Sequence, residues 1–435
     1  MSQPNPREVI TTQALMIWIA AMAVYLVAIT GRSSFGVAGL DAIERFDVDA
    51  GRIAVFTSVQ LGVYAIAQIP TGMLIDKFGP RILLVVGAVI MGVGQVILGF
   101  TSNYGVAIFA RVLIGAGDAT GFLSVMRILP YWFPLHRTPM FTQVTSSIGQ
   151  MGQFISAVPF LWLLGTAGWT AAFVTLGAVG ILVAIAAAVA VADSPEKLGV
   201  IPLEKEPPNS QGSSIGARLK AVFTSPIAWQ AYFIHYSGML PLIVFVMLWG
   251  MPMMTQGMEL SKGKASLVLT LLAVFLVLVG PLHGRISSRA QNIRPWVALG
   301  FVCLHVLTWV LFFAFGTGGG LAAITVVSFI LALCTPTSNY GFDIIRENMD
   351  RSVVATATGL GNMGGFTSGM LGAQLFGMVL DHSADAPNYS MPDFTSASLA
   401  VLAVWLCGMA GVVITHILRR RGGYAGPSVR IVEVT

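Results

Sequence analysis

The chain of 435 residues has few charged residues. Asp, Glu, Lys and Arg make up 10% of it and hydrophobic residues 55%, whereas soluble domains carry roughly 25% charge. So few charges cannot cover a surface that faces water, because soluble proteins rarely expose apolar patches beyond a few hundred Å². The composition excludes an ordinary soluble protein and indicates a surface that faces lipid.

Cysteines and catalytic motifs are also scarce. Cys303, Cys334 and Cys407 lie within apolar stretches and show no metal-type spacing. The sequence contains no H-E-x-x-H, no G-x-S-x-G and no G-x-x-x-x-G-K-[ST] phosphate loop. We therefore expect no catalytic residues, no metal and no cofactor, and we disfavour a membrane enzyme or sensor.

The basic residues do not indicate a nucleic-acid partner. The net charge is +5, but Lys and Arg are scattered in twos and threes, whereas nucleic-acid binding needs a basic face or helix.

Long apolar runs recur along the chain at the length of membrane spans, which need about 20 residues each. They predict an all-α membrane protein with twelve transmembrane helices. The predicted spans are 14–38, 52–75, 82–101, 105–129, 141–164, 169–192, 228–253, 265–285, 295–315, 319–341, 354–380 and 395–418.

The distribution of Lys and Arg predicts the orientation, because these residues collect in cytoplasmic loops. With the N-terminus inside, 17 of the 24 fall in inner segments, four in outer segments and three within spans. We expect both termini to be cytoplasmic and the protein to lie in a bacterial-type cytoplasmic membrane.

A long inner connection divides the chain into two halves. It is rich in Pro, Ser, Glu and Lys, a composition typical of linkers. The predicted domains are a six-helix bundle at 1–192, a linker at 193–227 and a second six-helix bundle with a short tail at 228–435. The segment Gly72–Arg81 after span two is echoed by Gly280–Arg289 after span eight, which indicates an internal repeat.

The segment Gly72–Arg81 matches G-x-L-x-D-[KR]-x-G-x-R, and it resembles the loop signature of the major facilitator superfamily. The resemblance covers nearly the whole chain and implies two pseudo-symmetric six-helix bundles. We interpret Asp76 as part of a cytoplasmic gate, paired with Arg81 or Arg137. Gly72 and Gly79 would allow close helix approach there. In the second half, Gly284 replaces the acid.

Four stretches resemble the anion:cation symporters, a group that includes hexuronate and galactonate permeases and vesicular glutamate transporters. The stretches are Arg32–Ala38, Tyr64–Gly72, Arg111–Asp118 with Trp132–Arg137, and Gly168–Trp169 with Asp193–Glu196. In that family the matching span-one arginine contacts the anion and the matching span-four acid couples protons. Many members have Asp just before that arginine, where this chain has Gly31, so it could move fewer protons or couple differently.

The charged residues within predicted spans are the main functional candidates, because each costs about 2.5–3.5 kcal/mol at a helix centre. Arg32 is predicted to bind an anion through its guanidinium, and Asp118 to carry the proton. Arg111 lies seven residues before Asp118, on the same helix face but about 10 Å away along the axis. We assign it to substrate binding and proton coupling.

Five further residues are secondary candidates. Tyr64, Gln150 and Asn362 would bind substrate or hydrogen-bond between helices. Arg127, near the inner end of span four, would belong to the gate or extend to the membrane interface. His235 would relay protons or be a hydrogen-bonded structural histidine.

The sequence therefore predicts a transporter for a small organic anion, working by alternating access with proton symport and functional as a monomer. Its partners would be the anion, protons and the lipid bilayer. The alternative is a proton-driven exporter of drugs or metabolites. Such exporters usually carry G-x-x-x-G-P-x-x-G-G in span five, whereas residues 149–159 contain no Gly-Pro pair.

Overall fold

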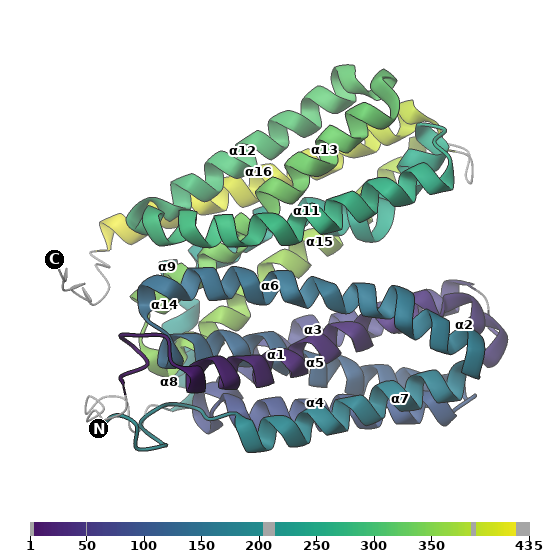
Figure 1. Ribbon diagram of the computed structural model, residues 1–435. Helices are drawn as coiled ribbons and strands as arrows, with labels where there is room; N and C mark the ends of the chain where they lie inside the picture. The colour runs from purple at the N-terminus through teal and green to yellow at the C-terminus, as the bar shows by residue number, and fades with distance from the viewer. Residues whose placement is uncertain (1–3, 49, 203–213, 384–388, 423–435) are drawn as a thin grey trace. The chain divides into compact units, whose positions relative to one another are not determined.

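The computed structural model describes residues 4–48, 50–202, 214–383 and 389–422. Within these ranges the chain is helical and forms no β-strand. The helices are labelled in Figure 1. Their bounds are α1 Thr12–Val37, α2 Gly39–Phe46, α3 Ala50–Phe78, α4 Pro80–Phe100, α5 Tyr104–Trp132, α6 Thr138–Ile155, α7 Leu161–Ala190, α8 Ile215–Phe223, α9 Pro226–Pro241, α10 Gly250–Pro252, α11 Lys262–Ala290, α12 Arg294–Leu311, α13 Gly320–Cys334, α14 Tyr340–Asn348, α15 Val354–Ser383 and α16 Met391–Arg421.

Short 3₁₀ and π-helical turns connect several of these helices. The 3₁₀ turns are Leu135–Arg137, Gln291–Ile293, Thr317–Gly319, Thr335–Asn339 and Arg351–Val353, and the π-helical turns are Ser156–Phe160, Leu242–Trp249, Met253–Gly257 and Phe312–Gly316. As a result, the described residues contain ten continuous helical stretches that are long and apolar enough to span a membrane.

Two of the ten stretches have twice the length of one span. Leu135–Ala190 has 56 residues and Lys262–Phe315 has 54. The first is broken at Gly168, whose φ of 80° lies outside the helical region, and the second at Gln291, with a φ of 37°. Each stretch therefore contains two of the twelve predicted spans, and the predicted all-α membrane fold is confirmed.

Polar caps fix where the helices begin. The Asn103 side chain accepts a hydrogen bond from the Val106 backbone N–H, so α5 starts directly after the short connection that follows α4. Thr11, Ser225 and Ser261 cap α1, α9 and α11 in the same way. These caps satisfy backbone N–H groups that a helix cannot pair internally.

The described chain divides into two compact units. One consists of residues 1–221 with 351–359, and the other of 222–350 with 360–435. The first turns of α15 are thus grouped with the first unit. The predicted domain boundaries at 192 and 228 stay a prediction.

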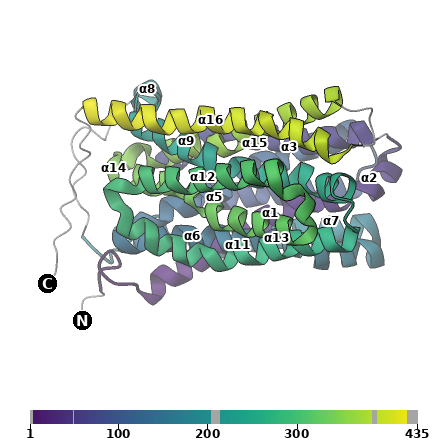
Figure 2. The same cartoon turned by 90° about the horizontal axis from the view of Figure 1, so that it is seen from above.

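Each unit packs around its own apolar core. In the first unit, α4 packs along α5 and α7, and aromatic residues such as Phe35, Phe56 and Trp169 are buried together. In the second, α11 lies beside α13 (Figures 1 and 2), and Trp405 and Phe245 lie in the core. Many large apolar side chains remain outward-facing instead, and such a surface suits lipid.

Candidate functional site

Arg32 of α1 and Asp118 of α5 form an ion pair inside the first unit. The guanidinium Nε lies 2.6 Å from Asp118 Oδ2, and Nη2 lies 2.9 Å from Oδ1. The Asp118 side chain has no exposed surface and that of Arg32 is 17% exposed. The sequence predicted separate roles for these residues, and the structure joins them in one bidentate pair.

Tyr64 of α3 completes this arrangement. Its ring centroid lies 4.3 Å from the Arg32 guanidinium carbon, and the side chain is buried. An aromatic face at this distance stabilises a cation. Tyr64 therefore contacts the residue predicted to bind the anion.

Arg111 lies about two turns before Asp118 on the same face of α5, and in the described residues it is buried without a direct ion pair. Its exposure is 1%, its Nε donates to the Phe56 carbonyl oxygen at 3.5 Å, and its guanidinium carbon lies 4.6 Å from the Phe35 ring centroid. Arg111 Nη1 and both side-chain polar atoms of Gln60 are buried without a hydrogen-bond partner in the described structure. A buried cation is costly without a counter-charge, so Arg111 is a candidate anion contact.

Gly31 lies against the buried amide of Gln95 from α4. Gln95 Nε2 donates to the Gly31 carbonyl oxygen at 3.2 Å. A Cβ at position 31 would lie 2.8 Å from that same nitrogen. An acidic side chain at this position therefore requires Gln95 to move.

The remaining substrate and proton candidates are described by the contacts that each makes within its own unit. Gln150 accepts a hydrogen bond from Gln153 Nε2 at 2.5 Å in the first unit. In the second unit, His235 Nδ1 lies 3.1 Å from the Ser338 carbonyl oxygen, and Asn362 also hydrogen-bonds the His235 side chain. His235 is buried and hydrogen-bonded, as a structural histidine would be.

Asp76, near the C-terminal end of α3, caps the start of α15. Its carboxylate accepts hydrogen bonds from the backbone N–H groups of Ala355 at 3.0 Å and Thr356 at 2.8 Å, and from Thr356 Oγ1 at 2.7 Å. Arg127 Nε lies 3.5 Å from Asp76 Oδ1. A carboxylate at a helix N-terminus is favoured by the helix dipole.

The predicted pairing of Asp76 with Arg81 or Arg137 is wrong. The Arg81 backbone N–H donates to Asp193 Oδ1 at 2.9 Å, and its guanidinium donates to the Ala188 carbonyl oxygen. Arg137 donates to His136 Nε2 at 3.2 Å. The reason is local geometry, because the Asp76 side chain is buried toward α5 and α15, whereas Arg81 follows the turn at Gly79.

The two glycines of the segment occupy positions where a side chain would collide. A Cβ at Gly72 would lie 2.6 Å from the Ala355 carbonyl oxygen. Gly79 has a φ of 90°, and a Cβ there would lie 2.6 Å from the Asp193 carboxylate. The first glycine permits the contact of α3 with α15, and the second the turn into α4.

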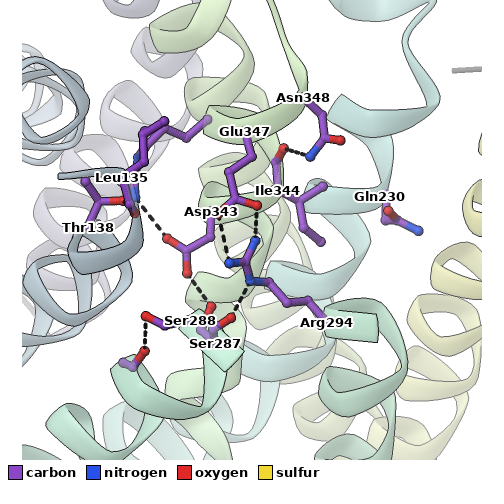
Figure 3. Close-up of polar contacts among 12 residues, drawn as sticks. Leu135, Thr138, Gln230, Ser287, Ser288, Arg294, Asp343, Ile344, Glu347 and Asn348 are labelled. Atoms are coloured by element: carbon purple, nitrogen blue, oxygen red, sulfur yellow. Dashed lines mark hydrogen bonds and ion pairs between the residues drawn. The ribbon is translucent and has the colours of Figure 1, made fainter. Parts of the chain in front are cut away.

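A second buried charged cluster, missed from the sequence, lies in the second unit (Figure 3). Asp343 of α14 accepts hydrogen bonds from Ser287 Oγ at 2.5 Å and Arg346 Nη1 at 3.0 Å. Arg294 of α12 binds Glu347 through Nη1 at 2.5 Å and Nη2 at 2.8 Å.

The cluster lies at the segment that echoes Gly72–Arg81. Ser287 belongs to that echo, where Gly284 replaces the acid, so the buried acid comes from α14 instead. The prediction ended span ten at 341, whereas α14 continues to Asn348. The sequence did contain a signal for this cluster, because Asp343 and Arg346 have the i, i+3 spacing of a helical ion pair.

Comparisons with known proteins agree with this fold. Over 407 residues, covering 90% of this chain and 92% of the relative, the chain is 24% identical to a probable sulfoacetate transporter of Cupriavidus necator. It is 28% identical over 179 residues to a probable L-galactonate transporter of Escherichia coli, covering 41% of this chain and 39% of that protein.

A solved structure and a family profile extend this result. The proton:xylose symporter XylE superposes with a TM-score of 0.70 at 13% identity, covering 95% of this chain and 96% of that one. The profile of the Major Facilitator Superfamily matches residues 21–373. These relatives are transporters and not enzymes, and the first two are named as probable transporters of organic anions. The chain belongs to the major facilitator superfamily.

Proposed function

We propose that this protein moves a small organic anion across the membrane by alternating access and couples the movement to proton symport. The observation that carries the proposal is the buried pair of Arg32 and Asp118. A guanidinium suits a carboxylate or sulfonate group, and a buried carboxylate is a group that can gain a proton.

The charge balance of the first unit favours an anion. Arg32, which is 17% exposed, and the buried Arg111 are two cations, and Asp118 is the acid paired with Arg32. Two further ion pairs of the first unit, Asp76 with Arg127 and Arg7 with Glu196, each carry no net charge. One positive charge is therefore left for an anionic substrate to balance.

The ion pair also supplies a mechanism for symport. Asp118 and the substrate compete for the guanidinium of Arg32. A proton on Asp118 neutralises the carboxylate and weakens its hold on Arg32, so the anion binds more readily. By linkage, binding of the anion raises the affinity of Asp118 for a proton by the same factor. Proton and substrate thus bind together, which is the thermodynamic requirement for symport.

We assign Arg32, Tyr64 and Arg111 to the anion site, together with Gln150 and Asn362, and Asp118 to proton coupling. Tyr64 contacts Arg32 directly, and Arg111 has a buried guanidinium nitrogen without a partner. His235 remains a weaker relay candidate, since its Nδ1 is committed to a backbone carbonyl.

We further propose that the Asp76 cap is part of a cytoplasmic gate. The cap holds the first turn of α15 through three hydrogen bonds, and Arg127 pairs with the same carboxylate. Releasing these bonds would free that turn during transport. We also include Gly72, Gly79, Arg81 and Arg137 in the proposed gate. Gly79 and Arg81 lie at the turn between α3 and α4. This assignment takes both termini as cytoplasmic in a bacterial-type plasma membrane, with a monomer as the working form.

Proteoliposome uptake tests the proposal. An inward proton gradient should drive uptake of an organic acid such as sulfoacetate or L-galactonate, with xylose as the uncharged control. Uptake of xylose but of no acid would overturn the anion assignment. Uptake driven only by an outward proton gradient would indicate antiport and favour the export alternative.

A further inference from the structure

An apolar groove lies at the C-terminal end of α3, which the proposed orientation places at the cytoplasmic face, apart from the proposed transport site. It has a volume of about 400 Å³, and its lining residues come from α3 and from the linker helix α8: Pro70, Met73, Leu74, Lys77, Ile215 and Arg218. Both helix segments belong to the first unit. The volume lies within the roughly 300–1,000 Å³ of sites that enclose small ligands.

The α3 wall is a continuous helical stripe. Its residues recur at positions i, i+3, i+4 and i+7, so they share one face of the helix. The stripe is apolar along three positions and ends in Lys77. Asp76 does not neutralise this face, since its carboxylate is turned to Thr356 and Arg127.

On the α8 wall, as on the α3 wall, an apolar residue is followed by a cation. Ile215 is 61% exposed, and Arg218 follows it by three residues on the same helix face. The six lining residues therefore include two cations and no acid, and the rest are apolar. A polar solute would find almost no hydrogen-bonding groups on these walls.

We propose that this groove binds an anionic phospholipid, with the phosphate headgroup at Lys77 and Arg218 and an acyl chain along Pro70, Met73 and Leu74. α3 contains a stretch long and apolar enough to span the membrane, and Leu74 is 43% exposed. Basic pockets at the cytoplasmic face recognise anionic headgroups in this way. The bound lipid would connect the inner end of α3 to the linker.

Native mass spectrometry of the full-length protein, released from nanodiscs of phosphatidylcholine and phosphatidylglycerol, tests the site. Lys77→Gln and Arg218→Gln should each lower phosphatidylglycerol retention about fivefold, and the double variant about 25-fold. Lys220→Gln is the matched control, because it removes a cation from the same helix outside the groove. It should retain the lipid as the wild type does.

A second pair of variants tests the acyl-chain half of the groove without changing charge. Leu74→Trp should fill the groove and lower retention, whereas Ile66→Trp, on a lipid-facing position outside it, should not. Equal retention by the double variant and the wild type would overturn the proposal. So would an equal loss in Lys220→Gln, or displacement of the lipid by soluble glycerol 3-phosphate.

Discussion

Arg32 and Asp118 lie 86 residues apart in the chain, yet both carboxylate oxygens of Asp118 accept hydrogen bonds from the Arg32 guanidinium. The group proposed to bind the substrate is therefore occupied by the group proposed to carry the proton. Substrate binding and protonation act on the same ion pair, so each changes the free energy of the other.

Arg32→Lys should weaken anion binding even though it keeps the positive charge. Lysine cannot reproduce the two parallel N–H donors of the guanidinium. We expect the affinity for the anion to fall roughly 10- to 100-fold, as loss of a charge-assisted hydrogen bond implies. Isothermal titration calorimetry measures it. Arg420→Lys, at an exposed position near the end of α16, is the control and should bind normally.

Anion affinity should rise as the pH falls in the wild type. Protonation removes the negative charge of Asp118 and so frees Arg32 for the substrate. The substrate should therefore bind more tightly at low pH. In Asp118→Asn the competition is absent at every pH, and the affinity should not vary with pH. Binding measured on a fully ionised substrate such as a sulfonate checks this. A variant that keeps the wild-type pH slope would place the titrating group elsewhere.

Gly72→Ala should destabilise the protein by about 1–3 kcal/mol, as overpacking does. Its Cβ would lie 2.6 Å from the Ala355 carbonyl oxygen and 2.6 Å from the Thr356 Cα, and backbone atoms cannot move aside as a side chain can. Gly62→Ala is the matched control on the same helix, because a Cβ there meets nothing within 4 Å. Thermal unfolding in detergent compares the two. Equal melting temperatures would show that α3 and α15 do not pack this closely.

Asp343→Asn should lower the free energy of unfolding by about 3 kcal/mol, because it removes the charged carboxylate that pairs with the buried Arg346. Asp350→Asn, at an exposed position two residues after α14, should change it by no more than about 0.5 kcal/mol. Chemical denaturation of the purified variants measures both. A loss of similar size in both would mean that the Asp343 cluster contributes little stability.

The sequence predicted the fold because membrane spans are local. A run of apolar residues or a basic loop can be recognised without knowing its neighbours, and buried charges such as Arg32 and Asp118 are conspicuous in such runs. The partner of each charge could not be predicted in this way. Asp76 pairs with Arg127 rather than Arg81 because of how α3, α5 and the turn at Gly79 pack.

Other features were missed because their local signal is weak. The short helices α2 and α8 have eight and nine residues and are too short to span a membrane. Asp343 was placed outside a span because the predicted span ended at residue 341. The structure shows that the charges of Asp343 and Arg346 satisfy one another inside the end of α14.

The most direct test of the account is proton-driven uptake by Asp118→Asn in proteoliposomes, compared with counterflow of the same anion across the same vesicles. Counterflow needs substrate binding and alternating access but no net proton movement. The account predicts that the proton gradient no longer drives accumulation in the variant, while counterflow remains measurable. Accumulation equal to that of the wild type under the same gradient would contradict it.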